Sequence, residues 1–177
     1  MRRRAATVFR AFPRKRSPLR ASLLRAAMVI VPACILAVVA ACAGPDMTGP
    51  LASRVRAWEG GASFTGSTAA LRQESSEITK MEARQDFAGM KSLCVVLGDD
   101  ARQAEGYLPA PDATMTQLLN SAYEAYYSAG EECYKAVAGR ANQSELAAMN
   151  TFIGQATSDL SEGVSRASTL AGEHGKS

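Results

Sequence analysis

Apolar residues recur every three or four positions from about residue 67 onward, a pattern typical of amphipathic helices. The most regular stretch predicts a helix from about residue 142 to residue 172, through Leu146, Met149, Ile153, Ala156, Leu160, Val164, Ala167 and Leu170. Asn142 stands three residues before Glu145, where it can cap the first turn, and Gly172 stands where the helix would end. The pattern therefore predicts a C-terminal helix with one buried face.

A second apolar stripe follows the proline-rich turn at Pro109–Asp112 and predicts a helix ending near Gly139. Its members are Met115, Leu119, Ala122, Tyr126, Ala129, Cys133 and Val137. Proline stops the preceding helix, and Asp112 or Thr114 can cap the new one.

The segment from about residue 67 to 105 contains two offset stripes. The first consists of Leu71, Ile78 and Met81, and the second of Phe87, Met90, Cys94, Leu97 and Ala101. Either one long helix carries a shift in its apolar face, or the helix breaks near Gly89 or Gly98. Helices joined by short loops favour antiparallel neighbours. The sequence thus predicts an all-α domain over residues 67–172, an antiparallel three-helix bundle, or a four-helix bundle if the first segment breaks.

Residues 42–66 are rich in Gly, Pro, Ser, Thr and Ala and show no sustained apolar period. This composition predicts a flexible linker. Trp58 leaves an alternative open, in which this segment packs back on the bundle. Residues 173–177 are predicted to be a disordered tail.

The N-terminal region combines a basic stretch with the apolar run Ala26–Ala41. The run ends in Val39-Ala40-Ala41-Cys42, which resembles the cleavage motif of bacterial lipoproteins. The resemblance implies that residues 1–41 are a removable signal peptide and that Cys42 carries the lipid, so that the domain is exported and anchored to a membrane. Ordinary signal cleavage and an uncleaved anchor are the alternatives. The spacing of Cys94 and Cys133 around the turn at Leu108–Asp112 also resembles that of uncharacterised small helical lipoproteins. This likeness implies no residue role.

The charge of the chain changes sign when it is divided at Cys42. The whole sequence contains 20 Lys+Arg and 17 Asp+Glu, but nine of the basic residues precede Ala26 and none of the acidic residues precedes Asp46. The part from Cys42 onward therefore has 11 basic and 17 acidic side chains, a formal net charge of −6. Because nucleic-acid binding requires clustered cations on a lasting surface, we do not expect a nucleic-acid partner.

Cys94 and Cys133 are the cysteines that remain when Cys34 and Cys42 are assigned to the N-terminal region. Both lie on apolar stripes of consecutive predicted helices, and exported proteins usually oxidise such pairs. The sequence predicts a Cys94–Cys133 disulfide, with two buried free thiols as the alternative. The two cysteines are not equidistant from the Pro109 turn, so either the loop must be extended or a helix must break.

Candidate catalytic and metal-binding residues are scarce. The sole histidine, His174, lies in the predicted tail, and no zinc-ligand spacing, phosphate loop or dinucleotide fingerprint is present. We therefore predict no catalytic residues, no metal and no cofactor. An enzyme using only carboxylates, such as Glu74 and Glu82, is the weakest alternative.

Tyrosines are concentrated on the middle predicted helix. Tyr126 belongs to its apolar stripe, whereas Tyr123, Tyr127 and Tyr134 form a second stripe next to it. Tyrosine combines a large apolar body with a polar tip, which suits partner surfaces and also suits burial between helices. We predict this second stripe as a partner-binding surface, with packing against another helix as the alternative.

These features together predict a non-enzymatic, membrane-anchored envelope lipoprotein whose helical domain binds another envelope component. A carrier or sensor of a small apolar ligand is the alternative, with the ligand held between the helices. Its site would be lined by Met90, Met115, Tyr126 and Met149.

Overall fold

The computed structural model describes residues 48–139 and 142–172, and these residues form five α-helices and no strand. The helices are α2 (Leu51–Gly61), α3 (Phe64–Ala83), α4 (Phe87–Glu105), α5 (Ala113–Ala138) and α6 (Gln143–Gly172). The all-α prediction is confirmed. The signal peptide, Cys42 and the tail at 173–177 lie outside the described residues.

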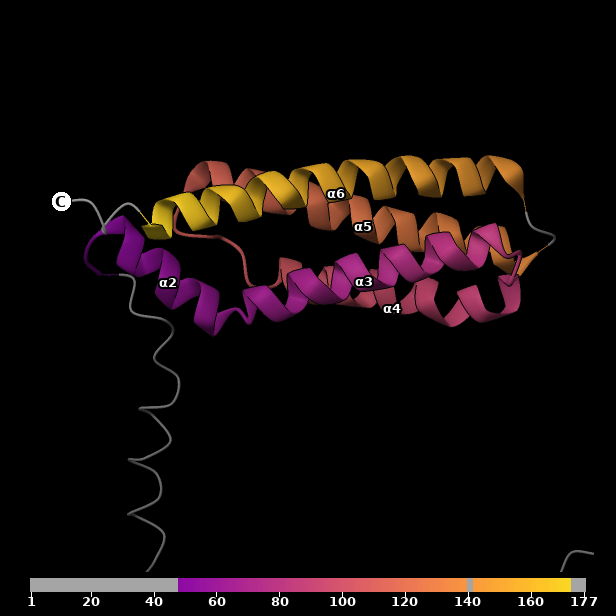
Figure 1. Ribbon diagram of the computed structural model, residues 1–177, viewed down its shortest axis with the longest axis horizontal. Coiled ribbons are helices and arrows are strands. Elements are labelled where there is room, and N and C mark those ends of the chain that lie inside the picture. Colours follow the sequence, from indigo (N-terminus) through magenta and orange to yellow (C-terminus); the bar gives the residue numbers. More distant parts are fainter. Residues whose placement is uncertain (1–47, 140–141, 173–177) are drawn as a thin grey trace, which may run out of the picture. The chain divides into compact units, whose positions relative to one another are not determined.

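Helices α3 to α6 run side by side, each antiparallel to the helix before it (Figure 1). Helix α2 precedes α3 at an angle and packs against the C-terminal end of α6. The guanidinium group of Arg56 on α2 donates a hydrogen bond to the carbonyl oxygen of Ala171 on α6. The first and last residues that the structure describes therefore lie at the same end of the bundle.

The predicted apolar stripes form the core. The residues that are fully buried and largest come from every helix: Val55, Leu71, Ile78, Met90, Cys94, Leu97, Met115, Leu119, Tyr126, Cys133, Met149 and Leu160. Burying such side chains contributes about 1.5–3 kcal/mol each relative to exposure, which makes this core the main source of stability.

The prediction of a flexible linker over residues 42–66 is wrong for residues 51–66, which are helical except at 62–63. Ala52, Val55 and Trp58 recur at three-residue steps and are buried. The Trp58 ring lies 5.1 Å from that of Phe64, and its Nε1 donates a 3.0 Å hydrogen bond to the carbonyl of Tyr107. The segment therefore packs on the bundle, which was the alternative that Trp58 left open. Burial of its large ring stabilises this arrangement although the segment, rich in small residues, has only a weak helical pattern.

The first predicted segment is broken, so the three-helix prediction is wrong; together with α2, the described residues form five helices. The break lies between α3 and α4, at residues 84–86, and not at Gly89 or Gly98. The carboxylate of Asp86 accepts a 3.0 Å hydrogen bond from the backbone N–H of Gly89 and so caps α4. A Cβ atom at Gly89 would lie 2.7 Å from Asp86 Oδ2. Gly89 therefore serves the cap and does not itself break the helix.

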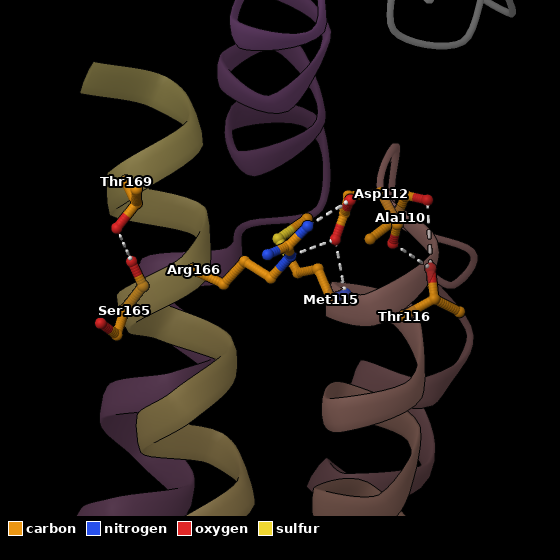
Figure 2. A network of polar contacts seen from close by, with 7 residues as sticks. All are labelled: Ala110, Asp112, Met115, Thr116, Ser165, Arg166 and Thr169. Carbon is orange, nitrogen blue, oxygen red and sulfur yellow. Dashed lines mark hydrogen bonds and ion pairs between the residues drawn. The ribbon is translucent and has the colours of Figure 1, made fainter. Parts of the chain in front are cut away.

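The start of α5 is tied to α6 by a polar network (Figure 2). Asp112 caps α5 by accepting a 2.8 Å hydrogen bond from the backbone N–H of Met115. Arg166 extends from α6 and donates to both carboxylate oxygens of Asp112, with 2.9 Å between Nη2 and Oδ2. The Arg166 guanidinium holds the pKa of Asp112 below its usual range. One carboxylate thus both caps a helix and anchors its neighbour.

The loop at residues 106–112 connects α4 and α5, and it is one of the two possibilities that the cysteine positions left open. Cys94 lies 11 residues before the end of α4, whereas Cys133 lies 20 residues after the start of α5. At 1.5 Å per residue the difference is about 13 Å, which the loop at residues 106–112 has to span. This loop allows the two cysteines to meet.

Candidate functional site

A surface groove between α4 and α5 is the candidate site. Its volume is about 220 Å³, and it is lined by Cys94, Val95, Gly98 and Asp99 from α4 and by Tyr127, Gly130, Glu131, Tyr134 and Lys135 from α5. We call it the α4–α5 groove. Val95 and Tyr134 are 46% and 42% exposed, so the groove offers apolar surface to solvent.

The floor of the groove is the place where α4 and α5 approach most closely. A Cβ atom at Gly130 would lie 2.7 Å from the carbonyl oxygen of Cys94 and 3.0 Å from the amide nitrogen of Gly98. Only glycine fits at such a crossing. Gly98 and Gly130 are both buried, so the two helix backbones pack directly against each other at this floor.

The disulfide between Cys94 and Cys133 lies directly beneath this floor. The two Cα atoms are 5.5 Å apart, and both cysteines are buried. The predicted disulfide is confirmed, and the alternative of two free thiols is wrong. The cross-link joins α4 and α5 at the groove, so it holds the groove walls in register.

Each of the two tyrosines in the groove is covered by a cation from α4. The Arg102 guanidinium lies 3.8 Å from the Tyr127 ring centre, and the Lys91 ammonium lies 5.4 Å from the Tyr134 ring centre. Both separations are in the range of cation–π attraction. The Tyr127 hydroxyl donates a 2.7 Å hydrogen bond to Glu131. These contacts fix the two rings as the ends of the groove.

The predicted partner-binding stripe is only partly at the surface. Tyr134 is exposed, Tyr127 is half-buried, and Tyr123 is 2% exposed. Trp58, Phe64 and Ala104 surround Tyr123, and burial raises its pKa to about 12. Tyr123 is thus unavailable to a partner in this structure, because α2 and the start of α3 cover it.

Lys91 and Arg102 were missed by the sequence reasoning. Both lie on α4 outside its apolar stripe. A signal was nevertheless present in the sequence. If Cys94 lies opposite Cys133 on two antiparallel helices, each step forward along α4 corresponds to one step back along α5. Lys91 then lies within two residues of the level of Tyr134, and Arg102 within two residues of the level of Tyr127.

The two carboxylates considered for an enzyme lie apart from the groove. Glu82 accepts hydrogen bonds from Asn150 at 3.0 and 3.1 Å. The polar neighbour of Glu74 is Asp100 on α4, and Glu74 Oε2 is buried without a donor among the described residues. Burial and the adjacent carboxyl group raise the pKa of Glu74 to about 7. The protonated form of Glu74 is therefore favoured more than that of an ordinary exposed glutamate.

The residues proposed for an apolar ligand, Met90, Met115, Tyr126 and Met149, are fully buried in the core. The α4–α5 groove is lined by other residues. Within residues 48–139 and 142–172, no group of three or more His, Cys, Asp or Glu side chains could hold a metal ion. In the same part of the chain, no helix is long and apolar enough to cross a membrane.

Comparison with known proteins adds no family to these observations. No protein-family model, no curated protein and no solved structure matches this chain.

Proposed function

We propose that this chain is an exported lipoprotein that is anchored through Cys42 and binds another protein through the α4–α5 groove. The observation that carries the binding proposal is the groove itself. Two exposed apolar side chains, Val95 and Tyr134, lie beside a glycine floor that a disulfide holds in register. Exposed apolar surface next to charged side chains is the usual character of an interaction site.

The anchoring part of the proposal is supported by the motif Val39-Ala40-Ala41-Cys42 and by the disulfide, a bond typical of proteins outside the cytoplasm. Labelling cells with radioactive palmitate tests it. The protein should carry the label, and Cys42→Ser should abolish both the label and retention in the membrane fraction. An unlabelled protein that begins at another residue would overturn this part.

The binding part is tested by a photo-reactive amino acid placed at Tyr134, with Gln155 on α6 as the control. Gln155 is exposed and distant from the groove in sequence and helix. Irradiation of whole cells should give a discrete cross-linked product from position 134 and none from position 155. The Tyr134→Ser variant, carrying the photo-reactive residue at Val95, should give much less of it.

Tyr134→Ser should also leave the fold nearly intact, since an exposed side chain of this kind contributes less than about 0.5 kcal/mol to stability. Chemical unfolding of the purified variant checks this. Cross-linking that is equally strong at positions 134 and 155 would contradict a role for the groove.

A further inference from the structure

We propose that α2 is a strap that opens at a hinge in residues 60–63 while α3 to α6 stay folded, and that it controls access to Tyr123. Tyr123 is the member of the predicted tyrosine stripe that this strap covers. The opening of α2 is a property of the fold. Its use as a control rests on the proposed function, in which the other tyrosines of the stripe bind a protein.

The strap closes an aromatic pocket around Tyr123. Trp58 on α2 and Ala62 in the hinge form one side of this pocket, and Phe64 on α3 and Tyr107 in the α4–α5 loop line other parts of it. The space that remains between these residues has no room for a water molecule. Removal of Trp58 and Ala62 from the pocket therefore exposes Tyr123 without unfolding the helix that carries it.

Helix α2 has little local stability of its own. It is 11 residues long, and isolated helices shorter than about 12–15 residues are marginal in water. Pro50 precedes α2 and no side chain caps its first turn, whereas Asp86 and Asp112 cap α4 and α5. Its first turn has no acidic side chain and its last turn no basic one, so the helix dipole is not offset. The helix therefore depends on its docking.

The docking of α2 combines a small apolar surface with polar groups that lose water. Its buried side chains are those of Ala52, Val55 and Trp58. The Nε atom of Arg54 is buried and has no hydrogen-bond partner among the described residues, and burial raises the pKa of the Glu59 carboxyl. Both groups regain water when α2 opens, which offsets part of the apolar stabilisation. Opening of α2 thus requires less free energy than unfolding of the whole bundle.

The hinge contains residues suited to a change of backbone direction. Gly60 and Gly61 end α2, and glycine is unfavourable in a helix because its free backbone has many conformations to lose. A Cβ atom at Gly60 would meet no neighbouring atom, so packing does not require glycine there. Ser63 has a φ angle of 49°, in the left-handed region that serine seldom adopts. Opening allows Ser63 to leave this region, so the boundary between α2 and α3 is where the backbone turns most easily.

Hydrogen–deuterium exchange of the purified full-length protein, with its disulfide intact, tests the strap. The amides of α2 should exchange faster than the slowest amides of α5 and α6. Val55→Ala removes a fully buried side chain of α2 that does not line the Tyr123 pocket. We expect this change to accelerate exchange in α2 about tenfold, because the closed state loses apolar contacts.

The matched variant is Met149→Ala, which truncates a fully buried side chain near the start of α6, whereas α2 packs against the other end of that helix. It should accelerate the slowest amides of α5 and α6 and leave α2 unchanged, because the contacts of Met149 persist when only the strap opens. Equal acceleration of α2 and α5 by Met149→Ala would show that α2 unfolds only with the bundle, and would overturn the inference.

Hydroxyl-radical labelling followed by mass spectrometry tests access to Tyr123. Labelling of Tyr123 should rise about tenfold in Val55→Ala, in step with exchange in α2, while labelling of the fully buried Tyr126 on the same helix stays unchanged. Unchanged labelling of Tyr123 would overturn its control by α2. Neither measurement uses a partner, so the absence of any cross-linked product at Tyr134 would overturn the proposed function and not the opening of α2.

Discussion

The two sides of α5 show how neighbouring tyrosines come to have different roles. Tyr123 and Tyr126 are buried, whereas Tyr127 and Tyr134 line the groove on the outer side of the same helix. The hydroxyl of Tyr126 lies 3.4 Å from that of Thr157 on α6. Tyr127 and Tyr134 instead meet the charged side chains of Arg102 and Lys91. The inner side of α5 thus packs in the core, and the outer side carries the tyrosines that line the groove.

The largest effect expected from this comparison follows removal of the Tyr126 ring. Tyr126 is fully buried, so Tyr126→Ala leaves a cavity in the core. Such truncations of aromatic side chains cost about 3–5 kcal/mol. The matched change Tyr134→Ala on the outer side should cost less than about 0.5 kcal/mol. Urea unfolding of both variants measures the difference, and similar values for the two would refute the distinction between the two sides.

A smaller effect is expected from removing the disulfide that lies between the core and the groove. Cys94 and Cys133 are separated by 39 residues, and a loop of that length corresponds to about 4 kcal/mol in the chain-entropy treatment. Because measured values are often lower, we expect the double change Cys94→Ala and Cys133→Ala to cost about 2–4 kcal/mol. Unfolding should be followed with and without reductant. Reductant should destabilise the parent protein and leave the double variant unchanged, and insensitivity of the parent would contradict this prediction.

The smallest effect concerns Glu74, a partly buried carboxyl group beside an otherwise apolar core. Its pKa of about 7 in the folded protein lies above the ordinary value of 4.5. The folded state therefore binds more protons than the unfolded state between these pH values, and stability falls as pH rises from about 4.5 to 7. Glu74→Gln should remove this slope. At pH 8 it should stabilise the protein on the order of 1 kcal/mol, a value reduced for solvent screening of a half-buried group.

Thermal unfolding between pH 4 and pH 8 measures this dependence. Glu77→Gln on the same helix is the control, because Glu77 is paired with Lys80 at 2.7 Å and the pKa of its carboxyl is lowered by that contact. It should not stabilise the protein at pH 8. A Glu74→Gln variant that is no more stable than the parent at pH 8 would show that the Glu74–Asp100 pair does not bind a proton in the folded state.

The sequence was informative where periodicity was long and unbroken. The stripes of α5 and α6 and the caps at Asp112 and Asn142 were predictable, since each depends on residues close in the chain. The cysteine positions left two possibilities, an extended α4–α5 loop or a broken helix, and the structure has the loop at residues 106–112. The helix break was predictable in kind and lies close to Gly89, but its exact place depends on the cap that Asp86 provides for α4.

The site was less predictable because it depends on contacts between distant segments. Tyr123 and Tyr127 stand four residues apart on one helix, and nothing in that spacing tells that α2 and the start of α3 cover only the first. Helix α2 itself has a weak apolar pattern, and the burial of Trp58 becomes favourable only when the loop carrying Tyr107 is in place. Whether a distant segment covers a residue depends on tertiary packing, and the local apolar pattern does not predict it.

If Cys42 carries the lipid, as proposed, the docking of α2 also limits how far the domain can move from that anchor. A flexible linker over residues 42–66, about 25 residues long, would let the bundle move through roughly 85 Å. Because α2 begins at Leu51, only nine residue steps separate it from Cys42, which gives a reach of about 30 Å. A chain anchored in this way would keep the α2 end of its bundle within about 30 Å of the lipid.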